Sequence, residues 1–109
     1  MFEQSPKEEF LSIIKEIEAD SSATQRILSA KIGISLGKTN YLLKKLIQKG
    51  LIKAKSFSSK PYKIKKINYM LTRRGIREKM LLTGHFLKIK EAEYNLLKGE
   101  WERLENNKA

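Results

Sequence analysis

Apolar residues recur every three or four positions near the start of the chain, which is the spacing of one helix face. A serine and a proline at positions 5 and 6 and a glutamate at position 8 form a capping sequence, and the apolar stripe follows at Phe10, Ile13, Ile14 and Ile17. This pattern predicts a helix over residues 6–19, ended by turn-forming residues at 20–22. Its outer face is acidic, so we interpret this helix as scaffold.

Residues 24–50 predict two short helices joined by a tight turn at Gly33. Thr24 is expected to cap a helix over 24–32 that buries Ile27, Leu28 and Ile32, and Ser35 to cap a second helix over 36–49. A helical wheel of the second helix places one set on an apolar side: Leu36, Thr39, Asn40, Leu43, Leu46 and Ile47. Opposite them lie Lys38, Tyr41 and Lys45. This is the pattern of a helix-turn-helix, whose second helix enters the major groove of DNA.

After Gly50 the apolar residues recur at every second position, which is the spacing of a strand. Residues 52–57 and 67–71 alternate, and the stretch between them is rich in turn formers and lysine. A basic-tipped hairpin over 52–71 is therefore predicted, followed by Thr72 as the cap of a final helix. The expected fold class is mainly α with a small β-hairpin (α+β): a winged helix-turn-helix domain over 1–72 and a long C-terminal helix over 73–109.

The final helix shows a heptad pattern. Its apolar positions are spaced by three and four residues, and the pattern extends backward by sevens, to give Met80, Leu87, Tyr94, Leu97, Trp101 and Leu104. A single small domain cannot cover a rod of this length, so we expect these residues to form the interface of a homodimeric coiled coil. The alternative is a helix that folds back on its own domain at Gly84.

Charge is segregated along the chain. The net charge is +11, and residues 23–90 carry 18 basic residues against one acidic residue, Glu78. Such a distribution is typical of proteins that bind a polyanion. The absence of cysteine excludes disulfides and thiolate metal sites, and the one histidine, His85, has no suitable partners. We therefore expect no enzymatic activity, no cofactor and no metal, and, without a leader or an apolar span, a cytoplasmic protein.

The second helix of the helix-turn-helix carries the candidate base-reading residues. Lys38 can donate to guanine, Asn40 can pair with adenine, and Tyr41 can contact a thymine methyl group or a phosphate. Two alternatives are a hydrogen bond of Asn40 within its own helix and packing of Tyr41 over Leu42. The candidate contacts on this helix are Ser35, Gly37, Lys38, Asn40, Tyr41, Lys44 and Lys45.

Further phosphate contacts are expected from the two flanking elements. The start of the preceding helix offers Thr24, Gln25 and Arg26, and the hairpin offers Lys60, Lys63, Lys65 and Lys66. The hairpin lysines could instead protect a solvated sheet edge. The start of the last helix contains Arg73, Arg74 and Arg77. Positive charge is unfavourable at the start of a helix, so we expect these arginines to pair with a bound anion such as phosphate, with Glu78, or with the acidic first helix.

The order of elements resembles that of the MarR-type winged-helix regulators. Three phrases are similar to a small subgroup found with bacterial exopolysaccharide (EPS) gene clusters: Gly-Ile-Ser-Leu-Gly-Lys-Thr-Asn-Tyr at 33–41, Leu-Lys-Lys-Leu-Ile-Gln-Lys-Gly at 43–50 and Leu-Thr-Arg-Arg-Gly-Ile at 71–76. The chain departs from the pattern at Thr39, where valine is expected, and at Ile27, where a capping glutamate is usual.

The resemblance implies a homodimeric, sequence-specific regulator of transcription that binds double-stranded DNA. Family members often bind a small-molecule effector, but no residue in this sequence marks a site for one. Two other functions fit the pattern: a protein-interaction module whose last helix docks a different protein, or a binder of structured RNA. Only one exposed aromatic residue is expected on the recognition helix, which disfavours single-stranded RNA.

Overall fold

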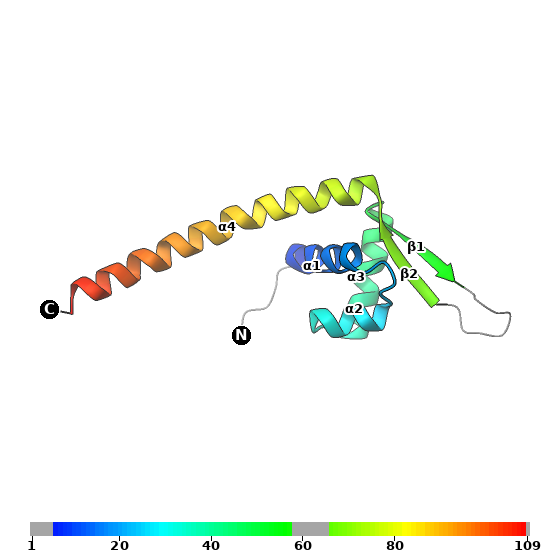
Figure 1. Cartoon of the computed structure of the whole chain (residues 1–109), viewed down its shortest axis with the longest axis horizontal. Coiled ribbons are helices and arrows are strands. Elements are labelled where there is room, and N and C mark those ends of the chain that lie inside the picture. The colour runs from blue at the N-terminus through cyan, green and yellow to red at the C-terminus, as the bar shows by residue number, and fades with distance from the viewer. Residues whose placement is uncertain (1–5, 58–65, 109) are drawn as a thin grey trace.

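The computed structural model describes residues 6–57 and 66–108. Four helices and a two-stranded antiparallel sheet follow one another along the chain, in the order α1 (Pro6–Ala19), α2 (Gln25–Ile32), α3 (Leu36–Gln48), β1 (Ile52–Phe57), β2 (Lys66–Leu71) and α4 (Arg73–Asn106) (Figure 1). The first three helices and the two strands lie within about one residue of their predicted ranges, which is within the difference between methods of assigning element ends, and α4 ends three residues before the end of the predicted range 73–109. The fold is a winged helix with a long C-terminal helix, and the predicted fold class is confirmed.

The core forms around α1, which lies between the other helices. Ile13 and Ile14 are fully buried, and they pack with apolar residues from every other element: Leu28, Leu42, Leu43, Leu46, Leu51, Ile52, Tyr69 and Leu82. Ile13, Ile14 and Ile17 therefore lie on one buried face of α1, as their spacing predicted. Ser5, the predicted cap, precedes the described residues.

Helix α2 buries less than was predicted. Leu28 is completely buried and Ile32 packs at the edge of the core, but Ile27 is 40% exposed. The prediction for Ile27 was wrong because neighbouring residues on a helix point about 100° apart. A helix of eight residues that turns Leu28 toward α1 and α3 leaves the preceding side chain at its margin.

The start of α4 is hydrogen-bonded to the two residues that precede β1. The Thr72 hydroxyl donates to the carbonyl oxygen of Gly50 at 2.6 Å, and the Thr72 N–H donates to that of Leu51 at 3.1 Å. A Cβ atom on Gly75 would lie only 2.0 Å from the Leu51 oxygen. The Leu-Thr-x-x-Gly sequence at 71–75 thus has a physical reason: threonine caps α4 and binds the strand, and glycine permits the close contact.

The two strands pair from Ile52 opposite Leu71 to Phe57 opposite Lys66. Residues 58–65, which would form the tip of the wing, are not among the described residues. The expected contacts of Lys60, Lys63 and Lys65 therefore cannot be placed, and for Lys66 only the backbone position at the start of β2 is given. The hairpin itself agrees with the alternation of residues 52–57 and 67–71.

Helix α4 is continuous over 34 residues and passes through Gly84 without a break. The alternative of a fold-back at Gly84 is therefore wrong. At 1.5 Å per residue the helix is about 50 Å long, and its second half extends away from the winged-helix domain (Figure 1). Within the described residues, no helix is both long and apolar enough to span a membrane.

Candidate nucleic-acid interface

Helices α2 and α3 are joined by a turn at Gly33, and each of the two helices begins at a side-chain cap. Gly33 adopts a left-handed conformation, with φ of 78°, and its N–H donates to the Ser29 carbonyl oxygen at 2.9 Å. Ser35 caps α3 by accepting a hydrogen bond from the Lys38 N–H at 3.1 Å. Thr24 caps α2 in the same way through the Ile27 N–H. The caps at Gly33 and Ser35 lie between the two helices and set how α3 follows α2, whereas the cap at Thr24 fixes where α2 begins.

Gln25 connects the starts of the two helices. Its side-chain amide donates to the Leu36 carbonyl oxygen at 3.1 Å. Gln25 was predicted to contact phosphate together with Thr24 and Arg26. In the structure its amide holds the first turn of α3 in place, while Arg26 is exposed beside it and the Thr24 hydroxyl, which accepts from Ile27, can still donate to a ligand.

The buried side of α3 differs from the helical-wheel prediction. Thr39, Leu42, Leu43 and Leu46 are buried, whereas Leu36 and Ile47, which were assigned to the apolar side, are each about 40% exposed. The difference arises because α3 packs against α1, α2 and β1 together, and this packing buries Leu42 in addition to Leu43 and Leu46. The outward, solvent-exposed side of α3 is therefore rotated relative to the side that the helical wheel predicted. It carries Gly37, Tyr41, Lys44 and Gln48.

This outward side of α3 is open and basic. Tyr41 is 59% exposed, and the Lys45 ammonium lies 5.6 Å from the centre of its ring. Lys44 is exposed, and a Cβ atom on Gly37 would meet nothing within 4 Å. Asn40 is half-buried at the margin. The side thus offers an aromatic hydroxyl, two ammonium groups and an unobstructed backbone to a ligand. Gln48 is a candidate that the sequence did not single out.

Lys38 has a different position from the one predicted. Its ammonium lies 2.8 Å from the carboxylate of Glu9 on α1, and the Glu9 side chain is only 6% exposed. The acidic outer face that was predicted for the first helix does not include Glu9, which is buried. Glu9 precedes Ile13 by four residues and so shares its buried face; that spacing was the signal available in the sequence.

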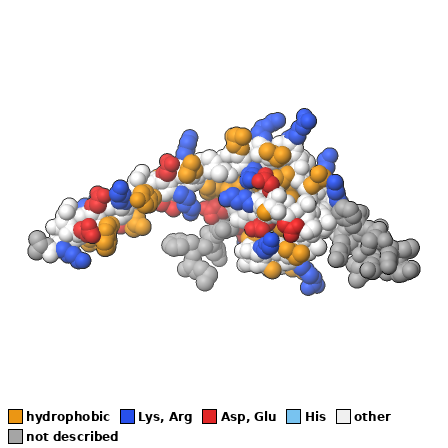
Figure 2. Space-filling model, viewed as in Figure 1, with side chains coloured by type: hydrophobic (Ala, Val, Ile, Leu, Met, Phe, Trp, Pro, Cys, Tyr) orange, Lys and Arg blue, Asp and Glu red, His pale blue; other side chains and the backbone are white. Residues whose placement is uncertain are grey.

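The other acidic residues of α1 also pair with basic residues on neighbouring helices. Glu16 lies 3.6 Å from Lys31 of α2, and Glu18 pairs with Lys79 of α4. Glu8 lies 3.9 Å from Lys90, further along α4. The space-filling view shows acidic and basic side chains interspersed on the face of the domain where α1 lies (Figure 2). The negative charge of α1 is thus used within the fold.

The arginines at the start of α4 have no acidic partner in the described part of the chain. None of the ion pairs found there involves Arg73, Arg74 or Arg77, so neither Glu78 nor α1 neutralises them. The Arg74 guanidinium lies over the backbone of Gly50. Across the same residues, no group of three histidine or acidic side chains is placed to hold a metal ion.

Comparison with known proteins identifies the domain. Residues 11–53 match the family model described as winged helix-turn-helix DNA-binding. No curated protein sequence matches the chain.

The solved structures that share the fold include three regulators of known origin. A MepR variant from S. aureus bound to an oligodeoxyribonucleotide has 20% sequence identity and a TM-score of 0.62, covering 91% of this chain and 72% of that one. MarR from Staphylococcus aureus, in complex with salicylate and kanamycin, has 18% identity and a TM-score of 0.57, covering 92% and 73%. A PadR-like transcriptional regulator from Bacillus cereus has 20% identity and a TM-score of 0.71, covering 81% and 89%. The chain therefore has the winged-helix fold of these MarR-type and PadR-like regulators, and its residues 11–53 are similar to the winged helix-turn-helix DNA-binding family.

Proposed function

We propose that this protein is a transcriptional regulator that binds double-stranded DNA in a sequence-specific manner as a homodimer. The observation that carries the proposal is the outward side of α3. Tyr41 and Lys44 project from the second helix of a helix-turn-helix, away from the core, within a segment of the chain that is strongly basic. Because base edges are read by the second helix of this motif, this side is suited to the major groove.

The proposed contacts follow from the position of each side chain. Asn40 and Tyr41 read base edges, with Lys44, Lys45 and Ser35 on the phosphates and Gly37 allowing close approach of the backbone. Arg26 and the Thr24 hydroxyl bind phosphate at the start of α2. The wing lysines at 60, 63, 65 and 66 follow the DNA backbone or enter the minor groove. Lys38 serves mainly to hold α3 against α1. If its ammonium moved to the DNA, the buried carboxylate of Glu9 would lose its counter-charge.

Two features support a homodimer. The predicted seam residues are exposed in the single chain, with exposed fractions from 57% to 72% for Met80, Leu87, Tyr94, Leu97, Trp101 and Leu104. A seam of this size would require burial in a stable protein. A dimer also presents two recognition helices to a near-palindromic site. The amino-acid sequence of residues 33–50 and 71–76 further supports placing the chain among the EPS-associated MarR-type regulators. Such a regulator would act in the cytoplasm.

Selection of genomic DNA fragments on the purified protein at low salt, followed by footprinting, tests this function. We expect a protected near-palindrome whose half-sites lie about 34 Å apart, one helical turn. Binding should fall steeply with salt, because several phosphates are contacted by each subunit. Absence of protection on every fragment would contradict the proposal. Structured RNA that competes as well as duplex DNA would point to an RNA-binding function instead.

A further inference from the structure

One apolar seam runs along the length of α4. Met80, Leu87, Tyr94 and Trp101 occupy one heptad position, and the second position holds Ile76, Thr83, Lys90, Leu97 and Leu104. Ile76 was not part of the predicted seam, but it is 53% exposed and continues the pattern toward the start of the helix. The seam therefore covers both the half of α4 that packs on the domain and the half that extends beyond it.

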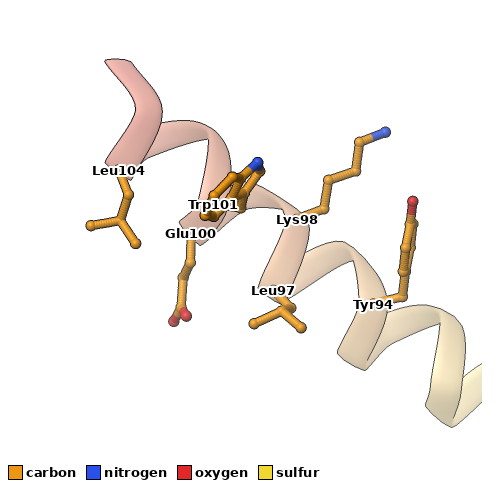
Figure 3. Close-up of a pocket in the computed structure, with 6 residues that line it drawn as sticks. All are labelled: Tyr94, Leu97, Lys98, Glu100, Trp101 and Leu104. Carbon is orange, nitrogen blue, oxygen red and sulfur yellow. The ribbon is translucent and has the colours of Figure 1, made fainter. Parts of the chain in front are cut away.

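The two halves of the seam carry different hollows. In the second half, Tyr94, Leu97, Trp101 and Leu104 line an apolar groove of about 430 Å³, with Trp101 and Leu97 projecting from successive turns (Figure 3). In the first half, a cavity of about 340 Å³ lies between α1 and α4 and is lined by residues that include Leu11, Thr83, Phe86 and Leu87. The second half of the seam therefore carries large side chains that need burial, and the first half has a cavity beside it that could hold one.

The two halves of α4 also carry opposite charge. Residues 73–90 hold six basic residues and one acidic residue, and residues 91–106 hold two basic residues and five acidic ones. If the α4 helices of two copies ran in the same direction, the basic half of each would lie beside the basic half of the other, and the acidic halves would also lie together. Two copies that run in opposite directions would set the acidic half of each against the basic half of the other, which is favourable.

We propose that two copies of this chain pair through α4 in an antiparallel arrangement, with Met80 opposite Leu104 of the partner subunit. The proposal rests on the proposed homodimer and specifies its geometry. Because the two heptad positions face one another in an antiparallel pair, the same register sets Leu87 opposite Leu97 of the partner subunit. It also brings Trp101 to the level of the partner subunit's Thr83, where the cavity between α1 and α4 can receive the indole.

The charged residues beside the seam agree with this register. Arg77, which has no acidic partner among the described residues, lies within about 3 Å along the axis of Glu105 of the partner subunit, and the pair occurs twice by symmetry. In a parallel pair each heptad layer faces its own copy, so Lys90 would face Lys90 of the partner subunit inside the seam. The antiparallel register places Lys90 against the face of the partner subunit's Tyr94 instead, a favourable contact for an ammonium group.

The position of the winged-helix domains also favours this arrangement. An antiparallel pair has its twofold axis perpendicular to α4, so the two domains lie toward opposite ends of the helix pair and can face one duplex that runs along it. A parallel pair has its axis along α4 and would hold both domains side by side at one end. In each chain, α2 lies on the far side of α1 from α4, where a duplex beneath the helix pair can reach it (Figure 1).

The chain contains no cysteine, so single introduced cysteines can carry spin labels without background. Ala92→Cys lies at the centre of the proposed register and Asn106→Cys near the end of the helix, and both positions are exposed and away from the seam. The distance between the two labels of a dimer is measured by pulsed electron spin resonance, and each labelled protein is first shown by sedimentation to match the unlabelled chain in mass.

The antiparallel pair predicts a short distance at position 92, below about 25 Å, and a separation of about 40 Å along the axis at position 106, from a rise of 1.5 Å per residue. Short distances at both positions would overturn the antiparallel arrangement in favour of a parallel one. A chain that sediments as a monomer with no dipolar signal would overturn the dimer itself. Binding to the footprinted duplex, measured on the same samples, shows separately whether the DNA-binding function stands.

Discussion

The ammonium of Lys38 lies 2.8 Å from the buried carboxylate of Glu9, and this contact joins the first turn of α3 to α1. Lys38 is half-exposed, so the pair lies at the margin of the core with one partner inside and one at the surface. The two residues therefore differ in what their removal leaves behind.

Replacement of either partner should lower the free energy of unfolding, but to different extents. Lys38→Met leaves a buried carboxylate without its counter-charge and should cost about 1–3 kcal/mol. Glu9→Gln leaves an ammonium that can turn to water, so the cost should be smaller. The double variant should recover most of the loss. Chemical denaturation at equal protein concentration measures all three, and equal losses for the two single variants would contradict this account.

Two glycines of the same helix should respond in opposite ways to alanine. Gly75→Ala places a methyl group against the Leu51 carbonyl oxygen and should destabilise the fold by at least about 2 kcal/mol through overpacking. Gly84→Ala meets nothing within 4 Å and should stabilise the fold by up to about 1 kcal/mol, because alanine favours helix. Thermal unfolding of the two variants compares them directly. A Gly75→Ala protein as stable as the original would show that the contact between α4 and β1 is not tight.

Thr39→Val should be nearly neutral, although Thr39 is completely buried. The Thr39 hydroxyl donates to the Ser35 carbonyl oxygen at 2.8 Å, and that oxygen also accepts from the Thr39 N–H. Valine has the same shape and leaves the carbonyl still bonded, so we expect a change below about 1 kcal/mol. The free energy of unfolding in urea tests this. A loss above that range would mean that the hydroxyl contributes to the packing of α3 beyond its one hydrogen bond.

Gly37→Ala should separate stability from DNA binding. The position is open in the free protein, so alanine should keep or slightly raise the stability of α3. If the backbone of Gly37 approaches a phosphate, the added methyl group should weaken DNA binding severalfold. Denaturation and fluorescence anisotropy with the footprinted duplex measure the two effects. Unchanged affinity would place Gly37 away from the DNA.

Most of the fold could be predicted because its signals are local. Thr24, Ser35 and Thr72 each cap a helix as expected, and the strands follow the alternation of their residues. The orientation of each helix was harder to predict, because it depends on neighbours distant in sequence. Ile27 and Ile47 have the polarity of core residues, yet the packing of α2 and α3 against α1 leaves both about 40% exposed.

The candidate interface was predicted less completely for the same reason. Tyr41 lies on the outward side of α3, as the helical wheel predicted, and Lys44, which the wheel did not place opposite the apolar side, is exposed there too. The pairing of Lys38 with Glu9 joins residues 29 positions apart, and no periodicity within α3 could indicate it. Gln25 likewise has a partner, the Leu36 carbonyl, that becomes accessible only once the two helices cross.

The central claim is that the outward side of α3 binds duplex DNA, and a matched pair of charge reversals tests it most directly. Lys44→Glu changes that side, and Lys88→Glu makes the same change at an exposed position on α4, away from the seam. Affinity for the footprinted duplex is measured by fluorescence anisotropy over a range of salt concentrations. We expect Lys44→Glu to weaken binding by about tenfold or more and to reduce the salt dependence by about one phosphate contact per subunit, with Lys88→Glu close to the original protein. Equal affinities for the two variants would contradict the claim.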